Sequence, residues 1–141
     1  MNLDLNGNWK GEITYGKEYG LSNGKKLIYH SEITQNENKI EGISFDISGF
    51  GTNSQPADFN GEIKNLEINF IKQYRTKHFL IPFRNKTLEL NKKGPEIFYK
   101  GIFDTSSKSF YGDWTMVLKK KLFFLIPITL KFTGTWTMIK N

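Results

Sequence analysis

The length, composition and charge of the chain exclude several classes of protein. Its 141 residues suit one sizeable core, and we expect a single domain over residues 1–141. Aromatic residues make up 15% of the chain, which argues against disorder, and the absence of cysteine excludes disulfide scaffolds and thiol chemistry. The net charge of +6 favours anionic partners without specifying one.

No segment has the pattern of a membrane anchor or a secretory signal. The longest apolar run, residues 122–130, is far shorter than the ~20 residues that a transmembrane helix needs. The first residues show neither the basic stretch nor the apolar stretch of a signal peptide. Together with the lack of cysteine, these features predict a cytoplasmic protein.

The chain predicts strands throughout, because alternating, β-branched and aromatic stretches recur between turns rich in Asn, Gly, Ser and Lys. The expected strands lie near residues 8–15, 25–35, 39–48, 56–64, 66–75, 96–104, 108–118 and 130–140. Eight strands in succession predict an all-β fold, an eight-stranded antiparallel up-and-down barrel, since closure removes the exposed edges of an open sheet.

The links between these strands alternate in length. Short links fall at residues 36–38, 65 and 105–107, and long links at 16–24, 49–55, 76–95 and 119–129. Alternate links of a meander lie at the same end, so we expect one tight end and one loop-rich end. The long links and their flanks carry most of the 20 Lys and Arg residues but few of the 14 acids. Binding residues commonly gather at such an end.

The first strand opens with Gly7-Asn8-Trp9. With this Gly-x-Trp opening, eight antiparallel strands over the whole chain and one loop-rich end, the chain resembles the lipocalin-like (calycin) barrels. The resemblance implies a barrel that carries a small hydrophobic ligand in its interior.

Alternation along the strands predicts which side chains face the interior, because successive side chains point to opposite sides. With the Trp9 side taken as inward, strand 39–48 is expected to turn its large apolar side chains inward, namely Ile43, Phe45 and Ile47. The predicted ligand-binding residues are mostly aromatic and lie toward the loop-rich end: Lys72, Tyr74, Tyr29, Tyr99, Tyr15, Phe70 and Trp114.

Lys72 is the unusual member of this set, since it lies between Phe70 and Tyr74 on an apolar face with no inward acid expected nearby. Burying an unpaired ammonium costs several kcal/mol. One hypothesis is that Lys72 and Tyr74 bind the carboxylate or phosphate of an amphipathic ligand, assisted by Tyr29 and Tyr99, while Phe70 and Trp114 line the cavity. In the other interpretation, Lys72 reaches water at the barrel mouth or a bulge turns it outward.

Two Phe-Leu-Ile-Pro segments place large apolar side chains in long links at the loop-rich end. Leaving them in water would cost ~1.5–3 kcal/mol per side chain. They are expected to extend hairpins and pack together, to cover a ligand portal, or to dock on a protein or an anionic membrane beside Lys119, Lys120 and Lys121. The residues of this predicted lid or docking surface are Phe79, Leu80, Ile81, Phe83, Phe123, Phe124, Leu125 and Ile126.

The sequence carries no pattern of a catalytic or metal site, and His30 and His78 are far apart. The leading hypothesis is therefore a non-enzymatic protein without a cofactor, which binds a small hydrophobic or amphipathic anionic molecule inside the barrel. The competing hypothesis is an interaction module with a filled barrel, whose basic, apolar end docks on a protein or membrane. An enzyme that uses the tyrosines as acids is a third option, and nucleic-acid binding is not expected.

Overall fold

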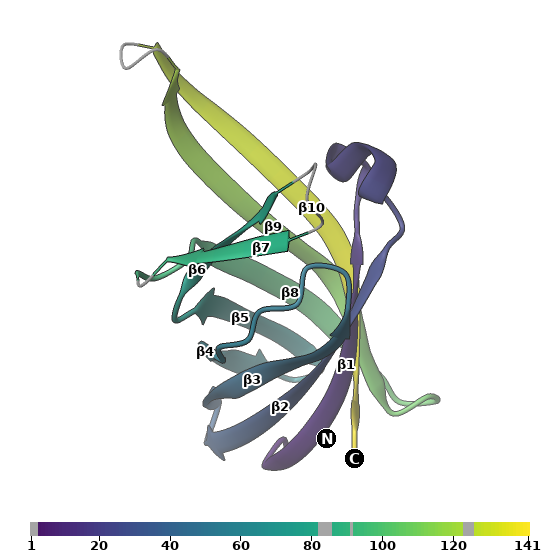
Figure 1. Ribbon diagram of the computed structural model, residues 1–141. Helices are drawn as coiled ribbons and strands as arrows, with labels where there is room; N and C mark the ends of the chain where they lie inside the picture. The colour runs from purple at the N-terminus through teal and green to yellow at the C-terminus, as the bar shows by residue number, and fades with distance from the viewer. Residues whose placement is uncertain (1–2, 82–85, 91, 123–125) are drawn as a thin grey trace.

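The computed structural model describes residues 3–81, 86–90, 92–122 and 126–141 (Figure 1). Most of the chain is β-strand, and the one helical segment among the described residues is the 3-10 helix η1 (Lys17–Ser22). The strands are β1 (Gly7–Tyr15), β2 (Lys26–Asn36), β3 (Lys39–Gly49), β4 (Ala57–Lys64), β5 (Glu67–Tyr74), β6 (Lys77–Ile81), β7 (Lys86–Leu90), β8 (Glu96–Asp104), β9 (Ser109–Leu122) and β10 (Ile126–Lys140).

Eight of these strands form a closed antiparallel barrel in the order β1-β10-β9-β8-β5-β4-β3-β2. The barrel closes between the first and last strands, where Trp9 pairs with Lys140 and Tyr15 with Gly134. The predicted all-β fold and up-and-down barrel are confirmed. The strands β6 and β7 form a separate two-stranded sheet within the link that the sequence predicted as a long loop.

The two ends of the barrel differ as the link lengths predicted. Figure 1 shows η1 and the outer ends of the strands β9 and β10 at the end opposite the chain termini. The strands β9 and β10 are 14 and 15 residues long, and their pairing continues outward through Leu118–Leu130 to Leu122–Ile126. They therefore form a two-stranded ribbon that projects beyond the barrel.

Aromatic side chains fill the barrel interior toward the tight end. Phe110 is fully buried and lies between Trp9, at a ring separation of 5.6 Å, and Trp136, at 6.4 Å. The indole of Trp9 donates a hydrogen bond to the carbonyl of Leu5 at 2.8 Å. Buried indoles need such partners, so this end of the barrel is a satisfied, closely packed core.

Two glycines of the barrel wall, Gly11 and Gly134, leave no room for a ligand, because an aromatic ring from the neighbouring strand covers each of them. Gly11 pairs with Tyr29 across β1 and β2, and a Cβ at Gly11 would overlap the ring of Tyr29. Gly134 stands in the same relation to Trp114, across β9 and β10.

The predicted inward face of β3 is wrong. Phe45 is 38% exposed and Ile47 is 61% exposed, whereas Ser44 is buried. Ser44 pairs with Ser31 and Asp46 pairs with Tyr29, so these positions share the inward side of β2, and a register shift follows between Tyr29 and Ile28. The prediction failed because the larger apolar side chains of this strand, Ile43 among them, lie on the opposite phase from the one that faces the interior.

Candidate functional site

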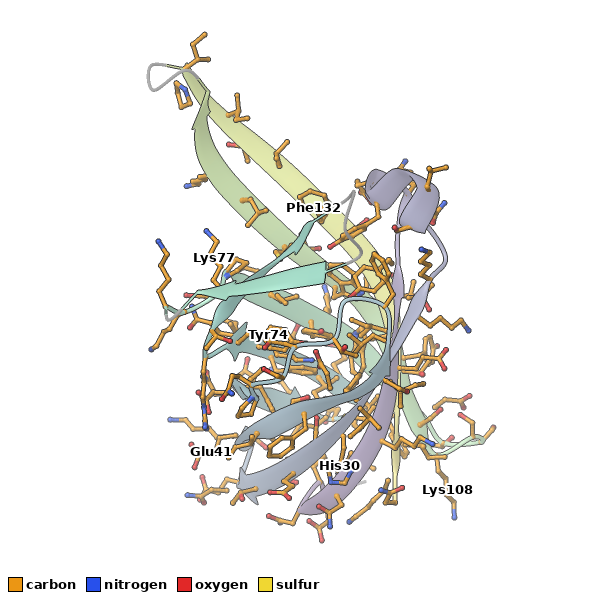
Figure 2. All side chains as sticks on the ribbon, in the orientation of Figure 1. His30, Glu41, Tyr74, Lys77, Lys108 and Phe132 are labelled. Atoms are coloured by element: carbon orange, nitrogen blue, oxygen red, sulfur yellow. The ribbon has the colours of Figure 1, made fainter. Side chains whose placement is uncertain are left out.

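A pocket of about 380 Å³, which we call the mouth pocket, opens at the loop-rich end of the barrel. Figure 2 shows Tyr74 inside the barrel and Lys77 nearer the β6–β7 hairpin. Most of the lining is aromatic or aliphatic, as in small-molecule sites generally. The lining residues are Ile13, Tyr15, Tyr19, Ser22, Phe50, Gly51, Tyr74, Thr76, Lys77, Gly94, Pro95, Ile97, Tyr99, Trp114, Met116 and Leu118.

One wall of the pocket is an aromatic cluster centred on Tyr15 at the end of β1. Its ring lies 4.8 Å from Tyr19 of η1, 5.2 Å from Phe50 and 6.0 Å from Trp114 of β9, each in an edge-on arrangement. The Tyr15 hydroxyl donates a hydrogen bond to the Phe50 carbonyl at 3.0 Å. Burial raises the pKa of Tyr15 and of Tyr19, so both phenols stay protonated at neutral pH.

Tyr74 and Tyr99 line the pocket where it meets the filled barrel. Tyr99 stacks on Phe70 with ring centroids 4.6 Å apart and an interplanar angle of 8°. Phe70 in turn meets Trp136 edge-on at 5.3 Å. Phe70, which the sequence predicted as a cavity wall, therefore lies on the far side of Tyr99 and supports it.

Lys72 lies inside the barrel with 1% of its surface exposed, as the alternation of β5 predicted. Both alternatives that the sequence left open, in which Lys72 reaches water at the barrel mouth or a bulge turns it outward, are therefore wrong. Its Nζ lies 4.7 Å from the ring centroid of Tyr29, 5.1 Å from that of Tyr74 and 5.7 Å from that of Tyr99. Within the described part of the chain, this nitrogen has no hydrogen-bond partner. We call Lys72 and these three tyrosines the lysine cage.

Asp46 is the acid that the sequence reasoning missed. The Tyr74 hydroxyl donates to both of its carboxylate oxygens, at 2.8 and 3.0 Å, and the backbone N–H of Asn53 donates at 2.9 Å. The apolar alternation of β3 concealed this residue, because it assigned Ile47 and Phe45 to the interior. The cross-strand pairing of Asp46 with Tyr29, which places both on the inward face, was the missing signal.

The electrostatics of the lysine cage follow from burial and from Asp46. Burial lowers the pKa of Lys72, and the negative charge of Asp46 opposes that shift. Burial and the same carboxylate raise the pKa of Tyr74, and burial raises that of Tyr99. The cage thus combines neutral phenols with an amine whose charged form is disfavoured.

Two other buried polar atoms have no partner among the described residues, Ser44 Oγ and Trp114 Nε1. Trp114 also lines the pocket. Buried polar groups are normally hydrogen-bonded, and each exception costs about 1–3 kcal/mol. A ligand or a water molecule that offered an acceptor to this indole would remove one such cost.

The structure brings all seven predicted binding residues to the lysine cage and the pocket beside it. Four of them form the lysine cage, two line the pocket wall, and one supports its floor: Lys72, Tyr29, Tyr74 and Tyr99; Tyr15 and Trp114; and Phe70. Whether they bind a ligand stays a prediction.

Four of the predicted lid or docking residues lie on strands that the structure describes. Phe79, Leu80 and Ile81 lie on β6, where Phe79 pairs with Leu88 of β7. Ile126 begins β10 and is 54% exposed. In the described strands, β9 and β10 continue the barrel pairing outward, whereas β6 and β7 pair with each other in a separate sheet. Whether these segments pack together, cover a portal or dock on a partner stays a prediction. Phe83 and residues 123–125 (Phe123, Phe124 and Leu125) lie outside the described residues.

A larger hollow of about 1000 Å³ lies along the outer wall of the barrel, from β2 to β9. Many of its side chains follow cross-strand rows of outward positions, for example Glu62, Asn69 and Lys100. These are exposed polar side chains of both charges, as expected of a solvated barrel wall. The buried Ile40, Phe70 and Tyr99 also border the hollow. The mouth pocket is the stronger candidate, because it is more apolar and borders the lysine cage.

The described residues offer no group of three or more His, Asp or Glu side chains that could hold a metal ion. His30 lies toward the end that holds the chain termini, with its ring 3.3 Å from the amide oxygen of Asn8 (Figure 2). In the described ranges, none of the helical structure is long and apolar enough to cross a membrane.

Comparisons of the chain with protein-family models, curated proteins and solved structures find no match. The barrel is established by the structure, and the resemblance to lipocalin-like proteins stays a prediction.

Proposed function

We propose that this protein binds a small apolar or amphipathic molecule in the mouth pocket, in the manner of lipocalin-like carriers and without chemical turnover. The observation that carries the proposal is an aromatic pocket of about 380 Å³ at the mouth of an otherwise filled barrel. Its volume is toward the lower end of the roughly 300–1000 Å³ typical of ligand sites. The occupant is therefore a small molecule with few polar groups.

The lining favours one orientation of the ligand. Ile13, Ile97 and Met116 offer an apolar wall for a hydrocarbon portion. Tyr74 and Tyr99 offer the polar floor, with Lys72 behind them. Because burial disfavours the charged form of Lys72 and the carboxylate of Asp46 lies beside Tyr74, a neutral polar group matches this floor better than a free carboxylate. We expect decanol to bind more tightly than decanoate.

A pair of matched substitutions on β8 tests the proposal. Ile97→Trp fills the pocket, whereas Ile102→Trp places the same side chain on the exposed outer face of the same strand. Isothermal titration with decanol should show binding to wild type and to Ile102→Trp, and a loss of binding in Ile97→Trp. Equal binding by both variants would place the ligand elsewhere and refute the proposal.

A second candidate function is docking of the loop-rich end on an anionic membrane or a protein. It is favoured by the β9–β10 ribbon, where Val117, Ile126 and Leu130 are exposed. Lys119 and Lys131 lie on the same ribbon, so an apolar surface is joined to positive charge. Sedimentation with vesicles that contain phosphatidylserine tests this function. Membrane docking predicts reduced sedimentation for Leu130→Ser. It predicts no change for Ile139→Ser, because Ile139 is exposed on the part of β10 that pairs with β1 in the barrel.

A further inference from the structure

The lysine cage suits a nitrogen that does not need hydrogen bonds. An ammonium group carries three N–H donors, and within the described chain Lys72 Nζ finds no acceptor for any of them. What surrounds it instead is the faces of Tyr29, Tyr74 and Tyr99, with the charge of Asp46 beyond Tyr74. Ring faces attract positive charge but do not satisfy three donors. The cage is thus a poor environment for an ammonium ion.

An imine nitrogen fits the same environment better. A neutral imine has no N–H, and a protonated imine has one, so conversion of the amine removes most or all of the unsatisfied donors. A protonated imine also keeps a positive charge near the ring faces and Asp46. The neutral form needs no acceptor, and the protonated form needs one where an ammonium ion needs three.

We propose that Lys72 forms a reversible imine with an aldehyde ligand that enters through the mouth pocket. This inference rests on the proposed function, since the ligand must first occupy the pocket. The Nζ lone pair attacks the carbonyl carbon and forms the C–N bond. The carbonyl oxygen takes up the two protons of the neutral amine and leaves as water, and the carbon–nitrogen double bond remains. No oxidant or reductant takes part.

The surroundings of Lys72 supply what this reaction needs. Burial lowers the pKa of Lys72, so the nucleophilic neutral amine makes up a larger fraction of this side chain than of an exposed lysine. Burial raises the pKa of Tyr99, so its phenol keeps a proton that a carbonyl oxygen can accept as a hydrogen bond. Tyr99 borders both the pocket and Lys72. It is the positioning residue expected to present the carbonyl to the amine.

The geometry also limits the class of carbonyl compound. Tyr74 and Tyr99 stand between the pocket and Nζ, which lies 5.1 and 5.7 Å from their ring centroids. The reacting carbon must pass between these rings while the rest of the ligand stays in the pocket. An unbranched aldehyde with its carbonyl at one end meets this requirement, whereas a carbonyl flanked by two bulky groups does not.

Reductive trapping tests the inference on the wild-type protein. The protein is incubated at neutral pH with decanal and sodium cyanoborohydride, and peptide mapping by mass spectrometry locates the adduct. We expect one decyl group on Lys72, lost in Lys72→Met and retained in Lys100→Met, whose lysine is exposed on the outer wall of β8. An adduct confined to surface lysines in the wild-type protein would overturn the inference, whether or not Lys72→Met folds.

Decanol separates the failure of this inference from the failure of the proposed function. It occupies the same pocket but cannot form an imine. If decanol binds and displaces the aldehyde from Lys72, both proposals are supported. If decanol binds while decanal leaves Lys72 unmodified, the imine is refuted and the proposed function stands. If neither compound binds, the proposed function is refuted and the imine with it.

Discussion

Replacement of Lys72 by methionine should stabilise the protein, although it removes a buried side chain. Methionine has a similar length and no charge to desolvate. Asp46 loses one favourable interaction but keeps its hydrogen bonds from Tyr74 and from the Asn53 N–H. Desolvating an ion inside a protein costs several kcal/mol unless other interactions offset that cost, and the ammonium group of Lys72 has no hydrogen-bond partner in the described chain. We expect the free energy of unfolding of Lys72→Met to exceed that of wild type by up to that cost at neutral pH.

The same variant should change how stability depends on pH. Burial lowers the pKa of Lys72 in the folded state below its ordinary 10.5, so the unfolded chain binds this proton more tightly. Wild-type stability therefore rises with pH between the lowered pKa and 10.5, by at most about 1.4 kcal/mol per pH unit. Lys72→Met lacks this contribution, so its advantage over wild type should shrink as the pH rises.

Urea denaturation from neutral pH to just below pH 10, where the tyrosines begin to titrate in the unfolded chain, measures both effects. Lys100→Met is the matched control, because Lys100 is exposed on the outer wall of β8. If Lys72→Met were no more stable than wild type and the two proteins kept a constant difference across this range, the argument for a desolvated Lys72 would be refuted.

Three further substitutions test the packing around the site and the core by denaturant unfolding. Tyr74→Phe removes the hydrogen bonds to Asp46 and should cost about 1.5–3 kcal/mol, because the acceptor is charged. Gly11→Ala should cost about 1–3 kcal/mol, since its methyl group would overlap the ring of Tyr29. Phe110→Ala should cost about 3–5 kcal/mol, because it empties a fully buried position at the tight end.

Each of these substitutions has a matched control at which the same chemical change should matter little. Tyr111→Phe and Phe98→Ala alter exposed side chains on the outer wall. Gly94→Ala adds a methyl group whose nearest neighbour, the Thr76 carbonyl oxygen, is 3.6 Å away. If a control lost as much stability as its partner, the contact named for that partner would not be the cause.

The barrel could be predicted from the sequence because its signals are local. Alternation and turn residues mark the eight strands, and the unequal links mark the loop-rich end. Lys72 could be placed inside for the same reason, since Phe70 and Tyr74 flank it with the correct period and both prove buried. The positions of the strands and the inward side of Lys72 could both be predicted from the alternation of side chains within a single strand.

The counter-charge of Lys72 could not be predicted in this way. Asp46 lies on a strand whose alternation points its apolar side chains outward, and only the pairing with Tyr29 reveals its inward position. That pairing precedes a register shift in the β2–β3 ladder, which no periodic pattern encodes. The sequence also could not predict that the ring of Tyr29 lies over Gly11. That contact depends on which residues of β1 and β2 face each other.

The central claim is that the mouth pocket, and not the rest of the barrel, holds a ligand. Methyl NMR during titration with decanol tests it most directly, because Met116 lines the pocket and Met138 is buried in the core. We predict that the methyl signal of Met116 shifts in proportion to occupancy while that of Met138 stays in place. An unchanged Met116 signal at saturating decanol would contradict the account.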